Sequence, residues 1–152
     1  MTTRTVVRFL NIVLAALLAG ATFGIATGYN PASLSPTAYV EQQQNAIRGL
    51  NVLLPLLGLI AIVLTLTSAY LQRSVKGQYL TLLIAALFLI ASGLITRFGN
   101  QPVNAIVMTW DPKMPPADWM ALRDRWWSLH LMRTASMFVG LCLIVWAGIK
   151  KD

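Results

Sequence analysis

Apolar residues form four long runs along the chain, and polar segments separate these runs. The runs cover residues 6–27, 51–71, 79–98 and 130–149. A helix of about 20 apolar residues is long enough to cross the ~30 Å hydrocarbon core of a bilayer. The pattern therefore predicts one domain over residues 1–152, an all-α membrane protein built as an antiparallel bundle of four transmembrane helices. Because the first run has the length of a full span, we expect a retained helix rather than a cleaved signal peptide.

Two long polar segments, residues 29–50 and 99–129, fall at the same end of such a bundle. The second helix begins after the breakers Asn-Pro and Ser-Pro, and its first turns are too polar for lipid. The fourth helix is expected to begin at Pro115 or Pro116, since proline is favoured in a first helical turn. Helices two and four should therefore extend into an extramembrane cap, opposite a short basic turn at residues 72–78.

Pro55 lies inside the long second helix, which the pattern extends to about residue 71. Proline has no backbone N–H and its ring crowds the preceding turn. The helix should therefore kink near Pro55, and the carbonyl of Asn51 should lack its usual helical partner.

Small residues recur at every fourth position of the first helix, namely Ala16, Gly20, Gly24 and Gly28. In lipid, such a stripe lets the backbone of a neighbouring helix approach closely. We expect the stripe to pack inside the bundle, and a seam between two copies of the chain is the alternative.

Composition agrees with lipid as the main solvent. Of the residues, 57% are hydrophobic and only 11% are charged, against about 25% charged in soluble domains. The net charge of +7 does not indicate nucleic-acid binding, because the basic residues stand singly or in pairs at the ends of apolar runs. Arg4 and Arg8 flank the first helix, which favours cytoplasmic termini, and a bacterial inner membrane is the expected location.

One face of the fourth helix carries most of the candidate chemistry. At spacings of four and three it holds Trp119, Arg123, Trp126, His130, Arg133, Met137 and Gly140. These spacings place all seven side chains on one stripe. Ionisable groups at the membrane edge usually face the bundle interior or a wet cavity. We expect the stripe to face the polar side of the second helix, which carries Glu41, Gln44, Asn45 and Arg48, and we expect Glu41 to pair with Arg133 or to orient His130.

Each candidate also has a structural interpretation. His130 is the best candidate for proton transfer, since histidine titrates near neutral pH, yet a lone histidine is often a hydrogen-bonded core residue. Arg133 can clamp a loop carbonyl. Asn100 and Asn104 can cap backbone ends or donate to a ligand carbonyl. An interfacial aromatic belt would account for some of the tryptophans, which are Trp110, Trp119, Trp126 and Trp127.

Several other chemistries lack their motifs. The chain has no HxxxH, no CxxC and no carboxylate cluster, so we expect neither a metal nor another cofactor. It has no Gly-rich phosphate loop and no GxSxG elbow. The apolar runs carry no continuous polar path, which argues against a channel or a pump.

The cap residues resemble a family signature. The matching elements are Asn100-Gln-Pro-Val-Asn104, Trp110-Asp-Pro, Asp118-Trp119, Trp126-Trp127, His130 and Arg133-Thr134. They resemble the small four-helix membrane proteins grouped with anthrone oxygenases, most bacterial members of which are known as a domain of unknown function. The resemblance is specific over residues 99–134 and looser elsewhere.

The resemblance implies oxidation of a polycyclic anthrone to an anthraquinone by oxygen, without metal, flavin or haem. His130 would act as general base, and Asn100, Asn104 and Arg133 would stabilise the resulting oxyanion. A flat lipophilic substrate would stack on tryptophans at the membrane edge. The expected binding residues are Trp110, Trp119, Trp126, Trp127, Glu41, Gln44 and Asn45. Because a motif does not fix a substrate, a non-catalytic protein that binds a membrane lipid, a quinone-like ligand or a membrane partner remains the alternative.

Overall fold

The structure is a computed structural model that describes residues 2–149, and within that range it contains only helices and turns. The helices are α1 (Thr3–Gly28), α2 (Pro36–Leu50), α3 (Leu53–Leu71), α4 (Lys76–Ile95), α5 (Gln101–Val107) and α6 (Trp119–Ile149). A short 3-10 turn covers Pro31–Ser33, and one π-helical turn covers Thr96–Asn100. Among the described residues, four helices are long and apolar enough to cross a membrane, namely α1, α3, α4 and α6. The predicted all-α membrane bundle is confirmed.

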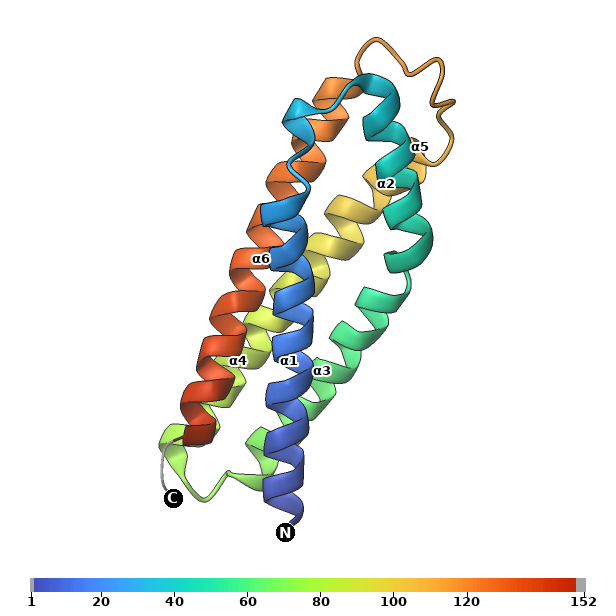
Figure 1. Cartoon of the computed structure of the whole chain (residues 1–152). Coiled ribbons are helices and arrows are strands. Elements are labelled where there is room, and N and C mark those ends of the chain that lie inside the picture. Colours follow the sequence, from blue (N-terminus) through green and yellow to red (C-terminus); the bar gives the residue numbers. More distant parts are fainter. Residues whose placement is uncertain (1, 150–152) are drawn as a thin grey trace.

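The four spanning helices alternate in direction and enclose one core (Figure 1). α6 packs against α1 and α4, and α3 packs against the same two helices. Many residues at these contacts are small, including Ala15, Ala19, Ala61, Ala69, Ala85 and Ala147. Small residues let helices approach closely in lipid, where burial of apolar surface gives little driving force. A Cβ atom at Gly140 would lie 3.0 Å from Cδ2 of Leu89, so α6 packs tightly against α4 there.

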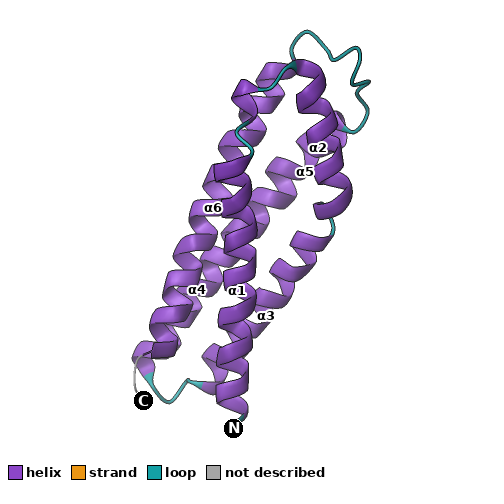
Figure 2. Cartoon of the chain, viewed as in Figure 1, coloured by secondary structure: helices purple, strands orange, loops and turns teal. Residues whose placement is uncertain are grey.

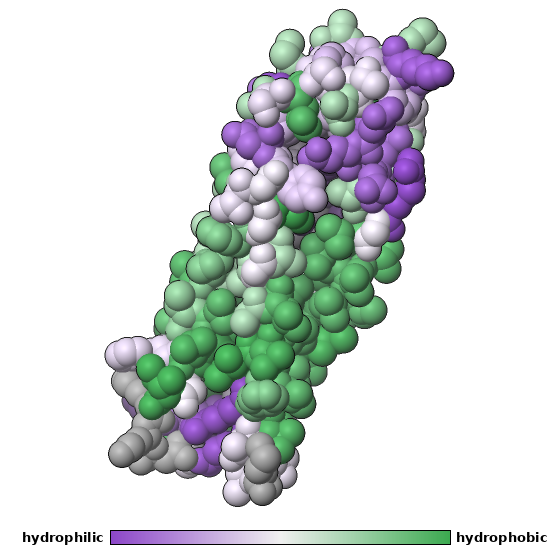
Figure 3. All heavy atoms as spheres, viewed as in Figure 1, coloured by the Kyte–Doolittle hydropathy of each residue, from purple (hydrophilic) through white to green (hydrophobic). Residues whose placement is uncertain are grey.

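On the face that Figure 3 shows, a broad apolar band covers the middle of the molecule, and the larger group of polar residues lies at one end. Large apolar side chains such as Leu17, Leu59 and Leu87 lie exposed on the outside of the band. A continuous apolar surface of this kind is typical of lipid contact. The polar end is the cap, which contains α2, α5, the loop after α5 and the first turns of α6 (Figures 1 and 2). The start of α1, the end of α6 and the turn between α3 and α4 lie at the opposite end.

The second helix breaks completely, where the sequence predicted a kink. Asn51 and Val52 form a turn between α2 and α3, which Figure 2 shows as a short loop. The carbonyl oxygen of Asn51 accepts a hydrogen bond from Nε2 of Gln101 at 3.2 Å. This contact supplies the partner that Pro55 cannot provide, because proline has no N–H.

The third and fourth helices differ from the sequence expectation at their cap ends. The third helix was expected to end near Phe98, but the chain continues through the π-helical turn into α5, so Asn100 and Asn104 lie within helical structure. Asn100 makes no side-chain cap hydrogen bond, and the capping interpretation is wrong. α6 begins at Trp119 rather than at Pro115 or Pro116, because residues 111–118 form a loop.

The glycine stripe of α1 does not pack inside the bundle. Gly20, Gly24 and Gly28 are exposed, and an added Cβ atom at any of them would meet no other heavy atom within 4 Å. The prediction that these residues serve close helix packing is wrong. Gly20 and Gly24 instead leave space beside α1 that forms part of a cavity.

Candidate functional site

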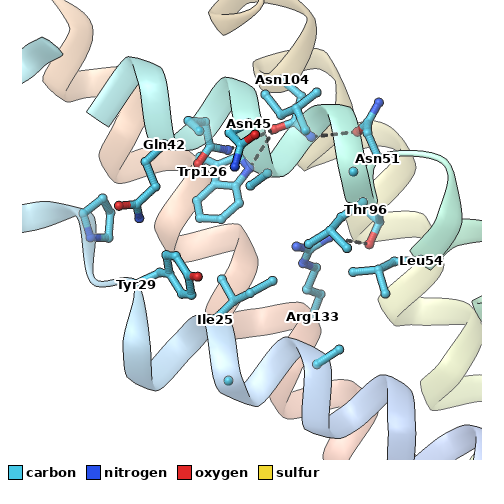
Figure 4. Close-up of a pocket in the computed structure, with 18 of the residues that line it drawn as sticks. Ile25, Tyr29, Gln42, Asn45, Asn51, Leu54, Thr96, Asn104, Trp126 and Arg133 are labelled. Atoms are coloured by element: carbon cyan, nitrogen blue, oxygen red, sulfur yellow. Dashed lines mark hydrogen bonds between the residues drawn. The ribbon is translucent and has the colours of Figure 1, made fainter. Parts of the chain in front are cut away.

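A cavity of about 560 Å³ lies between the second half of α1, the cap helix α2 and the upper part of α6 (Figure 4). Its volume falls in the ~300–1,000 Å³ range of sites for small organic ligands. The polar side chains in its wall are Gln42, Gln43, Asn45, Asn51, Thr96, Asn104 and Arg133. The aromatic ones are Tyr29, Tyr39 and Trp126. Among residues 2–149, the cavity therefore combines amide groups and aromatic rings with a single charged side chain.

Small residues on α1 leave one wall of the cavity open. Gly20, Ala21 and Gly24 line it, and the two glycines present only backbone there. Leu54 and Pro55, at the top of α3, line the cavity as well. Because these residues belong to helices long and apolar enough to span a membrane, the cavity extends from the cap into the apolar band.

Asn104 anchors the aromatic wall of the cavity. Its Oδ1 accepts hydrogen bonds from Nε1 of Trp126 at 2.8 Å and from Nε2 of Gln43 at 3.3 Å. Its Nδ2 donates to Oδ1 of Asn51 at 2.8 Å. One amide thus joins α5 to α6, to α2 and to the break before α3. The indole of Trp126 is held by its N–H, so one edge of the ring is fixed at the cavity.

Arg133 enters the cavity from α6 and is held by His130. Its Nε and Nη2 lie 3.1 and 2.9 Å from Nδ1 of His130, and its Nη1 donates to Oγ1 of Thr96 at 3.3 Å. A guanidinium has five N–H donors. In the described part of the chain, these three contacts leave two of the donors without a protein partner, one on Nη1 and one on Nη2.

In the part of the chain that the structure describes, no carboxylate lines the cavity to balance the charge of Arg133. Neither an aspartate nor a glutamate occurs among its lining residues, and Arg123 forms its ion pair with Asp124, away from the cavity. An unpaired cation near a membrane is costly and commonly marks a functional site. The site is therefore electropositive, and it suits an anionic or enolate-type oxygen.

His130 lies behind the cavity wall rather than in it. The side chain is fully buried, and its ring stacks on Trp126 at a centroid distance of 5.1 Å and an interplanar angle of 2°. Because Arg133 donates to Nδ1, the ring proton must sit on Nε2, which lies 3.1 Å from the carbonyl oxygen of Thr22. Both nitrogens are therefore engaged within the protein. In this arrangement His130 positions Arg133.

Asn100 is also withdrawn from the cavity. Its side chain is fully buried, and Nδ2 donates to the carbonyl oxygen of Trp126 at 3.0 Å. Its Oδ1 is buried without a partner among the described residues. Asn100 therefore ties the π-helical turn to α6 and does not line the cavity.

The remaining predicted residues divide between the cavity and the packing of the cap. Asn45 lines the cavity. Gln44 instead donates to the carbonyl oxygens of Val107 and Trp110 at 3.0 and 2.9 Å, and so closes the end of α5. Glu41 is exposed. The prediction that Glu41 pairs with Arg133 or orients His130 is wrong, because Thr96 and Thr22 fill those places.

The other tryptophans pack around the cap, outside the cavity wall. The ring of Trp119 packs against Tyr39 in a tilted arrangement at a centroid distance of 5.4 Å, and the guanidinium of Arg123 lies over the Trp119 ring at 4.9 Å. Trp127 stacks on His130 at 5.7 Å, and Trp110 packs against the apolar residues of the cap. Burial raises the pKa of Tyr39 to about 12, so its hydroxyl stays neutral.

Sequence reasoning missed several cavity residues. They are Tyr29, Gln42, Gln43, Asn51, Thr96, Gly20 and Gly24. The run Gln42-Gln43-Gln44-Asn45 was a usable signal, since four consecutive amide side chains point to more than one side of a helix. The spacing alone did not say which of them face inward. Within residues 2–149, no group of three His, Cys, Asp or Glu side chains could hold a metal ion.

The comparison with protein families identifies the chain. The family model described as anthrone oxygenase matches residues 44–143. The chain belongs to the anthrone oxygenase family. The matched region contains Thr96, Asn104, Trp126 and Arg133, whereas the glycines of α1 precede it. No curated protein and no solved structure matches the chain.

Proposed function

We propose that this protein is a cofactor-independent oxygenase that acts on a flat, lipophilic aromatic ketone of the anthrone class. One observation carries the proposal: among the described residues, two donors of the Arg133 guanidinium have no partner, and no carboxylate lines the cavity that this guanidinium enters. Family membership supports the reaction class. The position of the cavity at the edge of the apolar band supports entry of a substrate from the bilayer.

The overall reaction converts a ring CH₂ group and dioxygen into a ring C=O group and water. Loss of a proton from the CH₂ carbon turns the ketone into an enolate, whose negative charge rests largely on oxygen. The free donors of Arg133 would bind that oxygen and stabilise it more strongly than they stabilise the neutral ketone. The enolate carbon then reduces dioxygen and forms a C–O bond. Loss of water from the resulting peroxide leaves the quinone.

His130 would accept the substrate proton only after Arg133 has moved. In the resting arrangement the lone pair of Nδ1 points at the guanidinium. Rotation of Arg133 toward the substrate oxygen would free this lone pair, and Nε2–H would remain on the Thr22 carbonyl. The same movement would bring a cation to the oxyanion and expose the base. The proton on His130 would then return to the peroxide as water leaves.

Trp126 and Asn104 would hold the substrate ring in place. The indole is fixed at the cavity by its hydrogen bond to Asn104. An aromatic face offers a flat ligand both apolar contact and stacking. Holding the reacting carbon in one position contributes to the rate by reducing the entropy lost in the transition state.

Oxygen uptake by the purified protein tests the proposal. With an anthrone, the wild-type protein should consume one O₂ for each quinone formed, in the presence of a metal chelator. H130N should keep an acceptor near Nδ1 for Arg133 but lose the basic nitrogen, so turnover should fall while folding is kept. Absence of substrate-dependent oxygen uptake by well-folded wild-type protein would refute the proposed activity.

A non-catalytic binding protein for a lipid or quinone-like ligand is the second candidate. It is favoured by the enclosure of His130 and Asn100, whose side chains are fully buried and bonded within the protein. A binder would take up a quinone in the cavity without oxygen uptake. W126L should then weaken quinone binding, and W127L should weaken it much less, since Trp127 does not line the cavity.

We also infer that the termini face the cytoplasm of a bacterial inner membrane, with the cap on the other side. The basic pair Arg4 and Arg8 at the start of α1 supports this orientation. A D118C variant in a C142S background should react with an impermeant thiol reagent added outside the cells. Labelling only after the cells are lysed would reverse the orientation.

A further inference from the structure

A second cavity lies deeper in the bundle, between α1, α3, α4 and α6. Its volume is about 200 Å³. Its buried part is mainly apolar and is lined by Leu18, Ala61, Leu89 and Met137. Among the described residues, no aromatic ring lines it, and its polar lining residues are Thr22, Ser92, Thr96, Arg97, Gln101 and Arg133.

The second cavity reaches the lipid-facing surface between α3 and α4. Gly58 of α3 and Gly93 of α4 both line it, and an added Cβ atom at either would meet no heavy atom within 4 Å. Gly93 and the neighbouring lining residue Leu59 are exposed. Both helices belong to the set that can cross a membrane. A small molecule dissolved in the hydrocarbon can therefore enter here without passing through water.

The two cavities meet at Arg133. Both are lined by Leu54, Pro55, Thr96 and Arg133. The hydrogen bond from Arg133 to Thr96, at 3.3 Å, stands at this junction. The junction is thus next to the group that the proposed function assigns to the substrate oxygen.

We propose that the second cavity carries dioxygen from the bilayer to the substrate carbon held beside Arg133. This inference rests on the proposed function, because an oxygenase must bring two reactants to one carbon. A flat aromatic molecule in the first cavity blocks that approach, so the second reactant needs another one. Dioxygen is apolar and much smaller than a three-ring ketone, so a cavity of about 200 Å³ suits it better. Apolar cavities of similar size stay dry and bind small apolar molecules and gases.

The chemical step at the junction is the one in which the enolate carbon transfers electrons to dioxygen. A C–O bond forms at that carbon, and the O–O bond breaks later as water leaves. The oxidant is the dioxygen itself, and the electrons come from the substrate. The cavity supplies position and a path whose buried part is mainly apolar, and the electrons come from no group of its own.

Dissolved oxygen can be located directly, since it is paramagnetic and speeds the relaxation of nearby methyl groups. Leu89 lines the second cavity and is 3% exposed, and Leu82 is 1% exposed on the same helix. Both are buried and lie the same number of residues from the middle of α4 (Lys76–Ile95), so Leu82 is the matched reference for oxygen in the surrounding lipid. In methyl-labelled protein in nanodiscs under oxygen pressure, the methyl groups of Leu89 should relax several-fold faster than those of Leu82.

Substitution of a glycine at each cavity should change the KM of a different substrate. G93L adds a leucine side chain at the rim of the second cavity, and G20L adds one at the rim of the first. In both cases the new Cβ atom meets no heavy atom within 4 Å. G93L should raise KM for oxygen several-fold and leave KM for the anthrone unchanged. G20L should raise KM for the anthrone by about tenfold, the lower end for misfit in an apolar pocket. G77L adds the same side chain away from both cavities and should change neither constant.

Each outcome decides the inference. A relaxation excess at Leu89 that disappears in G93L supports the oxygen cavity even if no turnover is found, in which case only the proposed function fails. Equal relaxation of Leu82 and Leu89 overturns the inference whatever the activity. Cross-relaxation between Leu89 methyls and lipid acyl chains, without the oxygen effect, would assign the cavity to lipid and also overturn it.

Discussion

Replacing Asn104 by alanine should loosen the aromatic wall of the cavity. The side chain joins Trp126, Gln43 and Asn51 through contacts of 2.8, 3.3 and 2.8 Å. N104A removes all three at once. The backbone of α5 is a regular helix at this position, so alanine adds no strain of its own.

The expected cost follows from burial. Trp126 is 7% exposed, so its N–H loses its acceptor where water has poor access. A typical hydrogen bond contributes about 1 kcal/mol net, and a buried donor left unpaired costs about 1–3 kcal/mol. The bond at 3.3 Å is the weakest of the three, and water in the cavity can reach Gln43 and Asn51. We therefore expect N104A to lower the free energy of unfolding by about 2 kcal/mol.

N45A is the matched control for this measurement. Asn45 lines the same cavity, but its side chain makes no hydrogen bond in the described part of the chain. Reversible unfolding in detergent, followed by circular dichroism, compares the two variants. The near-ultraviolet signal of tryptophan should weaken in N104A and stay unchanged in N45A. Equal stability of the two variants, with the same tryptophan signal, would refute the role of Asn104 as an anchor.

Three further predictions concern packing, charge and pH. G140V should destabilise the bundle by about 1–3 kcal/mol through overpacking, because the added Cβ atom lies 3.0 Å from Leu89 and 3.4 Å from the Ala85 carbonyl. G77V, the control, should not destabilise the bundle, and thermal unfolding compares the two variants. E41Q should leave both the unfolding temperature and oxygen uptake unchanged, since Glu41 is exposed; a loss of either would restore its pairing with the site. The pKa of Tyr39 is about 12 in the folded protein, against an ordinary value of 10.0 in the unfolded chain. The unfolded chain therefore loses the proton first, and the free energy of unfolding should fall as the pH rises from 10 to 12. Y39F should remove that part of the pH dependence.

The sequence predicts the bundle and the inward stripe of α6 because both follow from helical spacing. Trp126, His130 and Met137 are buried as their spacing of three or four requires. The sequence likewise predicts that the Asn51 carbonyl has no helical partner, because proline at position 55 lacks the backbone N–H that would donate to it. The identity of the new donor, Gln101, depends on how α5 packs, and spacing carries no information about that.

The depth of each residue behind the cavity wall could not be predicted. Spacing places His130 and Arg133 on one face, but it does not say which of them reaches the cavity. The difference arises because Trp126 stacks flat on His130, and Arg133 covers its Nδ1. Similarly, Gln43 rather than Glu41 turns toward the site because α2 packs against α5. The glycines of α1 were wrongly predicted to pack against another helix. A glycine can allow close helix packing or leave open space, and the sequence does not distinguish the two.

The turnover of R133Q tests the central role of Arg133 most directly. R133Q removes the positive charge at the cavity, whereas R133K keeps a positive charge but loses the planar guanidinium. R125Q is the control, because it removes an exposed arginine on the same helix. With an anthrone as substrate, kcat for R133Q should fall by about a hundredfold or more, as for loss of an oxyanion donor; R133K should fall less, and R125Q should match the wild type. Folded R133Q that consumes oxygen at the wild-type rate would contradict the assignment of the site.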